Sequence, residues 1–464
     1  MSQPSDGNPD IGEVLKKQRA FFATGKTRDI AFRKEQLQRL REAVSAHEQE
    51  IYTALYGDFQ KPLFETFLSE VGTVLGEIKE AIAQVEKWAK PKRVKTPATH
   101  LPARSRIYSD PYGVVLIIAP WNYPFNLLMA PLVGALAAGN CAVVKTAPAA
   151  AQASAVIKKI LTGLFPEEYV AVFQGDRQVN RELLDQQYDY LFFTGSPALG
   201  RTILEAAARH LTPVTLELGG KSPCIVADDA DIALAARRIA WGKFFNCGQT
   251  CIAPDYLLVS EKIKEPLFRA LQAEIRRFYG EDPKKSPDFA RIVSDHHFRR
   301  VSALLKSGTI VVGGQSDAAE RYIAPTILDH VTFADPVMQE EIFGPILPTL
   351  TVPSLDAAIG LVNERPKPLS LYLFTQSEAV KRRVLGSTSF GGGCVNDTLM
   401  HFANSHFPFG GVGMSGMGAY HGEASFRTFS HQKSIVEKSL HFDFPFRYAP
   451  YSALGLRIIK KVMG

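Results

Sequence analysis

Cysteine is scarce in this chain, and no strong excess of one charge is present. The 464 residues include five cysteines, an odd number that makes no disulfide framework and fits a reducing compartment. The 53 basic and 47 acidic residues leave a net charge of only +6, and the basic residues are dispersed. This argues against nucleic acid as a partner and leaves anionic small ligands open. The polar, acidic start does not resemble a signal peptide, so we expect a cytoplasmic protein.

Long apolar runs are also missing. The nearest candidate for a membrane span, Leu127 to Val144, contains Pro131 and the turn pair Gly139-Asn140. These residues are expected to divide it into a helix and a strand, so no transmembrane segment is expected.

Two ligand signatures are incomplete. Gly220-Lys221-Ser222 has the ending of a phosphate-binding P-loop, but Thr215 stands where the earlier glycine is required. Cys247 and Cys251 have no second pair of Cys or His residues at ligand spacing, so we expect no metal site.

Short apolar runs separated by helical patterns begin at Gly113. Runs without polar alternation are buried on both faces, so they predict an α/β fold with a parallel sheet covered by helices. The expected strands are 114–118, 142–144, 170–173 and 190–193, and the expected helices are 127–138, 152–164 and 199–208. A second α/β series is expected from Pro213 to about His406. Ligands of such sheets lie at the carboxyl ends of the strands.

The segments outside these two series are expected to be scaffold. After a start that looks disordered, Ile30 to Tyr56 and Glu65 to Lys90 show helical periodicity. Arg104 to Ser109 alternates like an exposed strand, which is typical of an arm that pairs with another segment or subunit. The tail ends in a short amphipathic helix, for which we expect an oligomer contact or a lid over a pocket.

Cys251 lies in a turn of small residues between a helical pattern, Ile232 to Phe245, and a strand-like run, Tyr256 to Val259. Taken alone, this thiol is compatible with an inert core residue, with a redox pair formed with Cys247, or with a nucleophile presented to a cleft. Glu217 interrupts an apolar strand, where a carboxylate is costly unless it is paired or used.

Three further segments carry candidate ligand contacts. Asn122 can donate its amide N–H to an oxyanion or stabilise a turn. Gly195 to Gly200 is a strand-turn-helix whose free N–H groups can face a phosphate, although it also fits an ordinary capped turn. Glu341 and Phe343 share one face of an expected extended strand, where they can hydrogen-bond a ribose and stack beside a flat ring.

These residues lie within motifs by which the sequence resembles the aldehyde dehydrogenase superfamily over nearly its whole length. In the order of the family, the motifs are 120–124 (PWNYP), 193–196 (FTGS), 216–221 (LELGGK), 248–251 (GQTC), 341–345 (EIFGP) and 408–411 (PFGG). The sequence is most similar to the class 3 branch, through the runs 251–256, 415–422 and 447–451.

The resemblance implies an organisation in several parts and a homodimer. It implies a Rossmann-type NAD(P)-binding domain and an α/β catalytic domain joined by a small β bridging element. The implied ranges are 1–91 and 111–213 for the NAD(P)-binding domain, 214–408 for the catalytic domain, 92–110 and 429–452 for the bridging or oligomerisation element, and 453–464 for a tail helix.

The resemblance also implies a mechanism. Cys251 would attack an aldehyde, with the oxyanion held by Asn122 and the Cys251 N–H, hydride would pass to NAD(P), and Glu217 would activate the water that hydrolyses the thioester. The residues implied for cofactor binding are Trp121, Lys145, Thr194, Gly195, Ser196, Gly200, Leu218, Gly219, Glu341 and Phe343.

One departure bears on the cofactor. Members of the family that favour NAD commonly have a glutamate three residues after the lysine, whereas Pro148 stands here, so we expect NADP to be tolerated. Hydrophobic aldehydes, aliphatic or aromatic, are the substrates that class 3 implies. A cofactor-independent esterase using the same thiol and a non-catalytic binding or structural protein on the same fold remain the alternatives.

Overall fold

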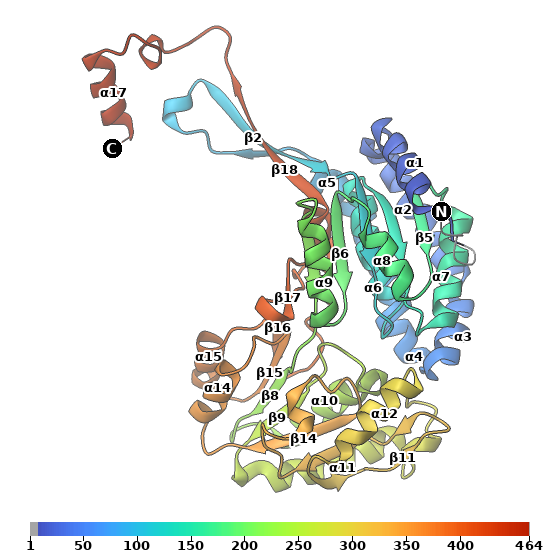
Figure 1. Ribbon diagram of the computed structural model, residues 1–464. Coiled ribbons are helices and arrows are strands. Elements are labelled where there is room, and N and C mark those ends of the chain that lie inside the picture. The colour runs from blue at the N-terminus through green and yellow to red at the C-terminus, as the bar shows by residue number, and fades with distance from the viewer. Residues whose placement is uncertain (1–7, 464) are drawn as a thin grey trace.

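Two sheets flanked by helices and a projecting three-stranded arm form the protein (Figure 1). The computed structural model describes residues 8–463. The first sheet is built mainly from the amino-terminal half of the chain, the second from the half that follows, and the arm carries the carboxyl-terminal helix. The α/β fold class expected from the sequence is confirmed.

The first sheet has six strands. In spatial order they are β17 (Gly416–Met417), β7 (Val214–Glu217), β6 (Tyr190–Thr194), β3 (Val114–Ile118), β4 (Cys141–Lys145) and β5 (Val170–Phe173). All pairs are parallel except β17 with β7. Every residue of β3, β4, β5 and β6 is buried, which explains why these runs lack polar alternation.

Four helices connect these strands. They are α6 (Asn126–Ala138), α7 (Ala151–Leu164), α8 (Arg177–Leu184) and α9 (Pro197–Ala208). Helix α6 is buried at every position, and Gly139 (φ 96°) ends it so that the chain turns into β4. The apolar stretch 127–144 is therefore a helix followed by a strand, as predicted. Within residues 8–463, no helix is long and apolar enough to cross a membrane.

Helices also form the first ninety residues. They are α1 (Ile11–Ala23), α2 (Ile30–Ala46), α3 (Glu48–Phe59), α4 (Leu63–Thr66) and α5 (Gly72–Ala89), with a π-helical turn at Phe67–Val71. The expectation of a disordered start is wrong for α1, because Asp10 caps it by accepting the N–H of Glu13 and its apolar side chains Val14 and Leu15 are buried. The helix expected over 30–56 is divided at His47.

Strand β7 belongs to the first sheet, although the sequence analysis assigned it to the second α/β series. It pairs in parallel with β6, and Gly416 pairs with Glu217 on its other side. The division expected between residues 213 and 214 is therefore wrong, because the chain leaves the first sheet only after Glu217. Apolar strands of the two sheets have the same sequence pattern, and the pattern does not identify the pairing partner.

The second sheet has seven strands. In spatial order they are β10 (Thr309–Val312), β13 (Thr326–Asp329), β14 (Ile346–Thr351), β9 (Tyr256–Val259), β8 (Pro223–Val226), β15 (Ser370–Phe374) and β16 (Gly392–Val395). Only β10 runs antiparallel to its neighbour. The accompanying helices are α10 (Ile232–Phe244), α11 (Glu261–Tyr279), α12 (Asp295–Ala303), α13 (Pro336–Gln339), α14 (Leu355–Asn363) and α15 (Glu378–Ser387). A separate strand pair is β11 (Ser316–Asp317) with β12 (Tyr322–Ile323).

The arm is an antiparallel sheet of β1 (Lys92–Val94), β2 (Ala103–Pro111) and β18 (Ser430–Lys438). Strand β2 pairs with β18 along its whole length. Helix α16 (Gly422–Thr428) precedes β18, and α17 (Ala453–Met463) lies beside the tip of the arm, away from both sheets (Figure 1). The two segments assigned to the bridging element thus meet in one sheet.

Candidate active site

A cavity of about 590 Å³ lies where the carboxyl ends of the first-sheet strands face the second sheet's loops. Most of the residues expected to form a site line this cavity: Trp121, Asn122, Thr194, Gly195, Ser196, Glu217, Leu218, Gly219, Cys251, Glu341 and Phe343. Lys145 and Gly200 do not line it. The position agrees with the rule that α/β sheets bind ligands at their carboxyl edge.

Cys251 and Glu217 share this cavity, although they come from different regions. Cys251 follows the 3₁₀ turn Phe245–Gly248 and is half-buried. Burial raises the pKa of the thiol, and the nearby carboxylates of Glu341 and Glu217 raise it further, whereas the backbone N–H of Ile252 and of Cys251 itself lower it. Cys251 is therefore a neutral thiol beside oriented donors, and its proton must leave before the sulfur can attack.

Cys247 has different surroundings from Cys251. It is fully buried in the core of the second region, whereas Cys251 packs against the core of the first. All five cysteines are free. The two thiols are therefore not bonded to each other in the structure, and they pack against different cores. Residues 8–463 contain no cluster of three or more His, Cys, Asp or Glu side chains that is able to hold a metal ion.

The backbone before Cys251 is strained. Asn246 (φ 52°) and Cys247 (φ 55°) both lie in the left-handed region, which costs of order 1–3 kcal/mol for each non-glycine residue. Hydrogen bonds hold this conformation. The N–H of Asn246 donates to Glu65 Oε2 at 2.9 Å, and its Nδ2 donates to the carbonyl oxygens of Asn122 at 2.9 Å and Gln249 at 3.2 Å. We call residues 245–251 the Cys251 turn.

Asn122 is attached to the same turn. It is buried, and its Nδ2 donates to the carbonyl oxygen of Gln249 at 3.1 Å. Because an amide nitrogen carries two hydrogens, one donor remains for a ligand. Together with the N–H of Cys251, this donor is suited to hold an oxyanion in the cavity. Gln249 is fixed in turn, because its Oε1 accepts the N–H of Val293 at 3.0 Å.

Glu217 ends β7 and is buried, 2% exposed. Among the described residues, no hydrogen-bond donor reaches either of its carboxyl oxygens. Burial raises its pKa well above the usual range, because no charged group or donor in this part of the structure stabilises the ionised form. A buried carboxyl group without a protein partner is typical of a site that receives water or a ligand.

Glu341 and Phe343 do not lie in a strand, contrary to the sequence analysis. Residues 340–345 form a loop, and Phe343 has φ 52°, which a strand does not allow. Both side chains nevertheless line the cavity. The Phe343 ring lies edge-on to Trp121, with centroids 5.3 Å apart. A Cβ at Gly219 would come within 2.2 Å of Glu341 Oε2, so this glycine leaves room for the carboxylate. Burial raises the pKa of Glu341 to about 8.

Several cavity residues escaped the sequence analysis. His297 on α12 lies beside Trp121, with the ring centroids 4.7 Å apart and the ring planes tilted by 44°. Burial lowers its pKa to about 4, so the imidazole is neutral. Basic side chains also line the cavity: Arg201, Lys221, Arg300, Arg365 and Lys367. Lys221 belongs to the 216–221 motif, whereas no local pattern in the sequence identifies the other four, and together the five favour an anionic ligand.

Two of these basic residues hold the Glu341 segment. Arg300 donates to the carbonyl oxygens of Glu341 at 3.3 Å and Ile342 at 2.6 Å. Lys221 forms an ion pair with Asp255, and Asp255 Oδ1 accepts the N–H of Ile342 at 3.0 Å. The loop that carries Glu341 is therefore fixed from two sides.

The turn after β6 presents the start of a helix to the cavity. Ser196 caps α9, and the N–H of Gly195 donates to the carbonyl oxygen of Glu217 at 2.9 Å. The first N–H groups of such a helix are suited to a phosphate. Gly200 lies one turn later and serves packing, because a Cβ there would lie 2.8 Å from a Leu218 methyl group.

Lys145 ends β4 and is buried, which lowers its pKa to about 8. Pro148 follows in an exposed turn, so no carboxylate stands at that position. The helix start at Ser196, the basic lining and the aromatic pair Trp121 and Phe343 fit the phosphates and the flat ring of a dinucleotide.

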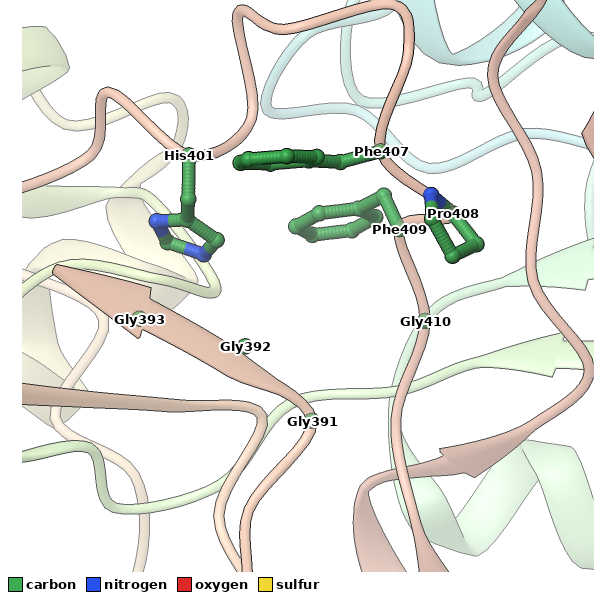
Figure 2. A pocket seen from close by; sticks show the side chains of 8 residues that line it. All are labelled: Gly391, Gly392, Gly393, His401, Phe407, Pro408, Phe409 and Gly410. Carbon is green, nitrogen blue, oxygen red and sulfur yellow. The ribbon is translucent and has the colours of Figure 1, made fainter. Parts of the chain in front are cut away.

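A smaller cavity of about 250 Å³ lies elsewhere, between Gly391–Gly393 and residues 407–410. Figure 2 shows the rings of His401, Phe407 and Phe409 above the three glycines. Its lining contains neither a thiol nor a carboxylate. His401 Nε2 is 3.1 Å from Ser370 Oγ, and burial lowers its pKa to about 4. This cavity therefore lacks the groups needed for acyl chemistry.

Comparisons with known proteins identify the family of the chain. The family model described as "Aldehyde dehydrogenase family" matches residues 2–435. The chain is 50% identical to 4,4'-diaponeurosporen-aldehyde dehydrogenase of Staphylococcus aureus, over 93% of this chain and 95% of the relative. It is 48% identical to human aldehyde dehydrogenase family 3 member B1, over 98% and 97%.

The chain belongs to the aldehyde dehydrogenase family. A solved structure described as the substrate-bound state of Staphylococcus aureus AldH superposes with a TM-score of 0.96 at 48% identity, covering 98% of this chain and 100% of that one. The resemblance to class 3 is confirmed by the family 3 relatives. This aldehyde dehydrogenase is thus an oxidoreductase that converts an aldehyde to a carboxylic acid with NAD(P)⁺. The non-catalytic alternative is not supported.

Proposed function

We propose that Cys251 is the nucleophile of this oxidation. Once its proton has passed to a water molecule in the cavity, the Cys251 thiolate attacks the carbonyl carbon and forms a thiohemiacetal, whose oxyanion is held by Asn122 Nδ2 and the N–H of Cys251. NAD(P)⁺, when bound, supplies the hydride acceptor that turns this adduct into a thioester. The observation that carries the proposal is that Cys251 and Glu217 line one cavity.

Glu217 then acts as the general base for hydrolysis. It takes a proton from water, the hydroxyl adds to the acyl carbon, and the C–S bond breaks to release the acid and the Cys251 thiolate. The absence of a protein donor at its oxygens, among the described residues, leaves them available to water. Its raised pKa makes the ionised form a strong base.

The direct test is NAD(P)H formation at 340 nm after an aldehyde is mixed with the protein. Cys251→Ala is expected to lower the rate at least a thousandfold while NAD(P)H still binds, as measured by fluorescence. Nitrophenyl ester hydrolysis without cofactor addresses the esterase alternative. Retained aldehyde oxidation by Cys251→Ala would remove Cys251 from its role.

For the cofactor, Glu341 is proposed to accept hydrogen bonds from the nicotinamide ribose, with Trp121 and Phe343 beside the ring. Gly195, Ser196 and the start of α9 would face the pyrophosphate, with Thr194, Leu218 and Gly219 shaping the wall. Lys145 would reach the adenosine ribose from outside the cavity described above, and Gly200 would let α9 pack closely beneath the pyrophosphate. With Pro148 in place of a carboxylate, a 2′-phosphate meets no like charge there, so NADP is proposed to serve as well as NAD.

The proposed substrates are hydrophobic aldehydes, aliphatic or aromatic. Support comes from the relatives, one of which is named 4,4'-diaponeurosporen-aldehyde dehydrogenase and others of which are named as members of aldehyde dehydrogenase family 3. A panel of aldehydes graded by chain length and aromaticity tests this proposal. A kcat/KM that does not rise with chain length or with an aromatic ring would contradict it.

A homodimer is the proposed assembly. Strand β18 is an edge of the arm and β16 is an edge of the second sheet, so both expose unpaired backbone groups in the single chain. Ile435 and Val436 on β18 are 38% and 51% exposed, as expected of a surface that a second copy covers. Light scattering after size exclusion measures the mass.

The five free cysteines favour a reducing compartment, and we propose the cytoplasm.

A further inference from the structure

Glu65 links the amino-terminal helices to the Cys251 turn. It lies on α4, and its Oε2 accepts the N–H of Asn246 at 2.9 Å, although 181 positions separate the two residues in the sequence. Glu65 does not line the large cavity, so it does not contact a ligand there. Its carboxyl group instead satisfies a buried backbone donor in the strained part of the turn.

The contact extends to the groups proposed to act on the aldehyde. Asn246 Nδ2 donates to the carbonyl oxygens of Asn122 and Gln249, and Asn122 Nδ2 donates to Gln249. Asn246 therefore holds the backbone of Asn122, which carries the proposed oxyanion donor, and the backbone of Gln249, two residues before Cys251. Because Asn246 is not a glycine, its left-handed conformation persists only while such contacts hold it.

Several charged groups face Glu65. Lys61 attracts its charge, Asp288 repels it, and the N–H of Asn246 stabilises it. The direct ion-pair partner of Lys61 is Glu70, whose Oε1 lies 3.0 Å from Lys61 Nζ. Burial is the largest influence, and the net result raises the pKa of Glu65 to about 7.

The remaining titratable neighbours do not change charge near neutral pH. Tyr123, Tyr279 and Cys247 each interact electrostatically with Glu65. Burial raises the pKa of all three groups, so they stay neutral while Glu65 titrates.

We propose that Glu65 is a positioning residue of this enzyme, which holds the Cys251 turn through Asn246 and holds it more firmly when the carboxyl group is ionised. The proposal rests on the proposed role of Cys251. A hydrogen bond to an ionised acceptor is stronger than one to a neutral acceptor, so deprotonation tightens the turn. A carboxylate remote from the ligand thereby contributes to the rise of kcat with pH.

The test compares two variants with wild type across pH 6 to 8.5. Glu65→Gln keeps an oxygen acceptor but cannot ionise. Its kcat is expected to match wild type within about twofold at pH 6 and to fall about fivefold below it at pH 8.5. Glu65→Leu removes the acceptor and is expected to lose about fiftyfold in kcat at every pH. The Kd for NADH, measured by fluorescence, is expected to stay unchanged in both.

Asp58→Asn is the matched control. Asp58 is also buried with a raised pKa, and it accepts backbone N–H groups of Gln152 at 3.2 Å and Ala153 at 2.9 Å, away from the Cys251 turn. Its kcat ratio to wild type is expected to be flat across pH.

The proposal would be overturned if the ratio of the wild-type kcat to the Glu65→Gln kcat were constant across pH 6 to 8.5. Equal kcat values for Glu65→Leu and Glu65→Gln would also overturn it. The Gln variant decides the question if the Leu variant does not fold.

Iodoacetamide labelling followed by peptide mass spectrometry tests Cys251 separately. Failure of that labelling defeats the proposed nucleophile, whereas a flat ratio with Cys251 labelled defeats only the role of Glu65.

Discussion

Glu70, in the π-helical turn Phe67–Val71, has hydrogen-bond donors at both carboxyl oxygens, whereas Glu217 in the large cavity has none among the described residues. Glu70 accepts hydrogen bonds from Lys61 Nζ at 3.0 Å and from the N–H groups of Phe125 at 3.1 Å and Asn126 at 2.9 Å. No donor among the described residues reaches the oxygens of Glu217. Both carboxyl groups are buried to the same degree, so burial alone does not separate a structural group from a reactive one.

The difference lies in what opposes the cost of burial. Burial raises the pKa of both groups, but at Glu70 the ammonium of Lys61 and two backbone N–H groups act against it. At Glu217 only burial acts. A carboxylate supplied with donors fixes the helices around it, and one left without donors remains available for water.

Substitution of Glu217, the carboxyl group without partners, is expected to have the largest effect on catalysis. Glu217→Gln should lower kcat about a thousandfold, because the water that attacks the thioester loses its base. Acyl-enzyme should accumulate and appear by mass spectrometry as an adduct on Cys251. The melting temperature should not fall, since no partner is lost. Normal turnover without an adduct would contradict the assignment of Glu217.

Breaking the ion pair between Lys61 and Glu70 should lower the stability of the protein rather than its activity. Lys61→Met leaves the Glu70 charge buried and unpaired, at an expected cost of about 3 kcal/mol in the free energy of unfolding. Denaturant titration measures this cost. Lys159→Met serves as the control, because Lys159 pairs with Glu50 at the surface and should change stability by less than about 1 kcal/mol. Equal losses in the two variants would refute the comparison.

Both kcat and the melting temperature should depend on pH through Glu217. Below the pKa of Glu217, kcat should rise up to about tenfold per pH unit as the base ionises. Its raised folded pKa favours folding fully below the unfolded value of about 4.3, and that contribution is lost as pH rises through the folded pKa. Wild type should therefore lose melting temperature relative to Glu217→Gln between pH 5 and pH 9. Parallel melting curves across this range would argue against a raised pKa.

The smallest expected effect concerns the cofactor. Pro148→Glu places a carboxylate where a 2′-phosphate is proposed to lie, so kcat/KM with NADP should fall about fivefold relative to NAD. Steady-state assays with both cofactors measure the ratio. The melting temperature should stay the same, because Pro148 is exposed. An unchanged ratio would place the adenosine ribose elsewhere.

The sequence predicted the strands of the first sheet well, because a run such as Val114–Ile118 is buried on both faces and carries no ambiguous polar residue. It misassigned β7, since an apolar strand pattern does not identify the pairing partners, which are β6 on one side and Gly416–Met417 on the other. The site motifs identified Cys251 and Glu217 through family resemblance. The loop conformation of Phe343 and the contact between Glu65 and Asn246 depend on tertiary packing, which no local pattern records.

The pairing of Gly416 with Glu217 has a consequence for synthesis. The six-stranded sheet lacks its outer strand until residue 417 has left the ribosome, and the N–H of Leu218 lacks its acceptor, the carbonyl oxygen of Ser415. The first sheet to be translated is therefore among the last to be completed. A nascent chain stalled before that point holds both the thiol and the carboxylate but leaves the strand beneath the carboxylate with an open edge.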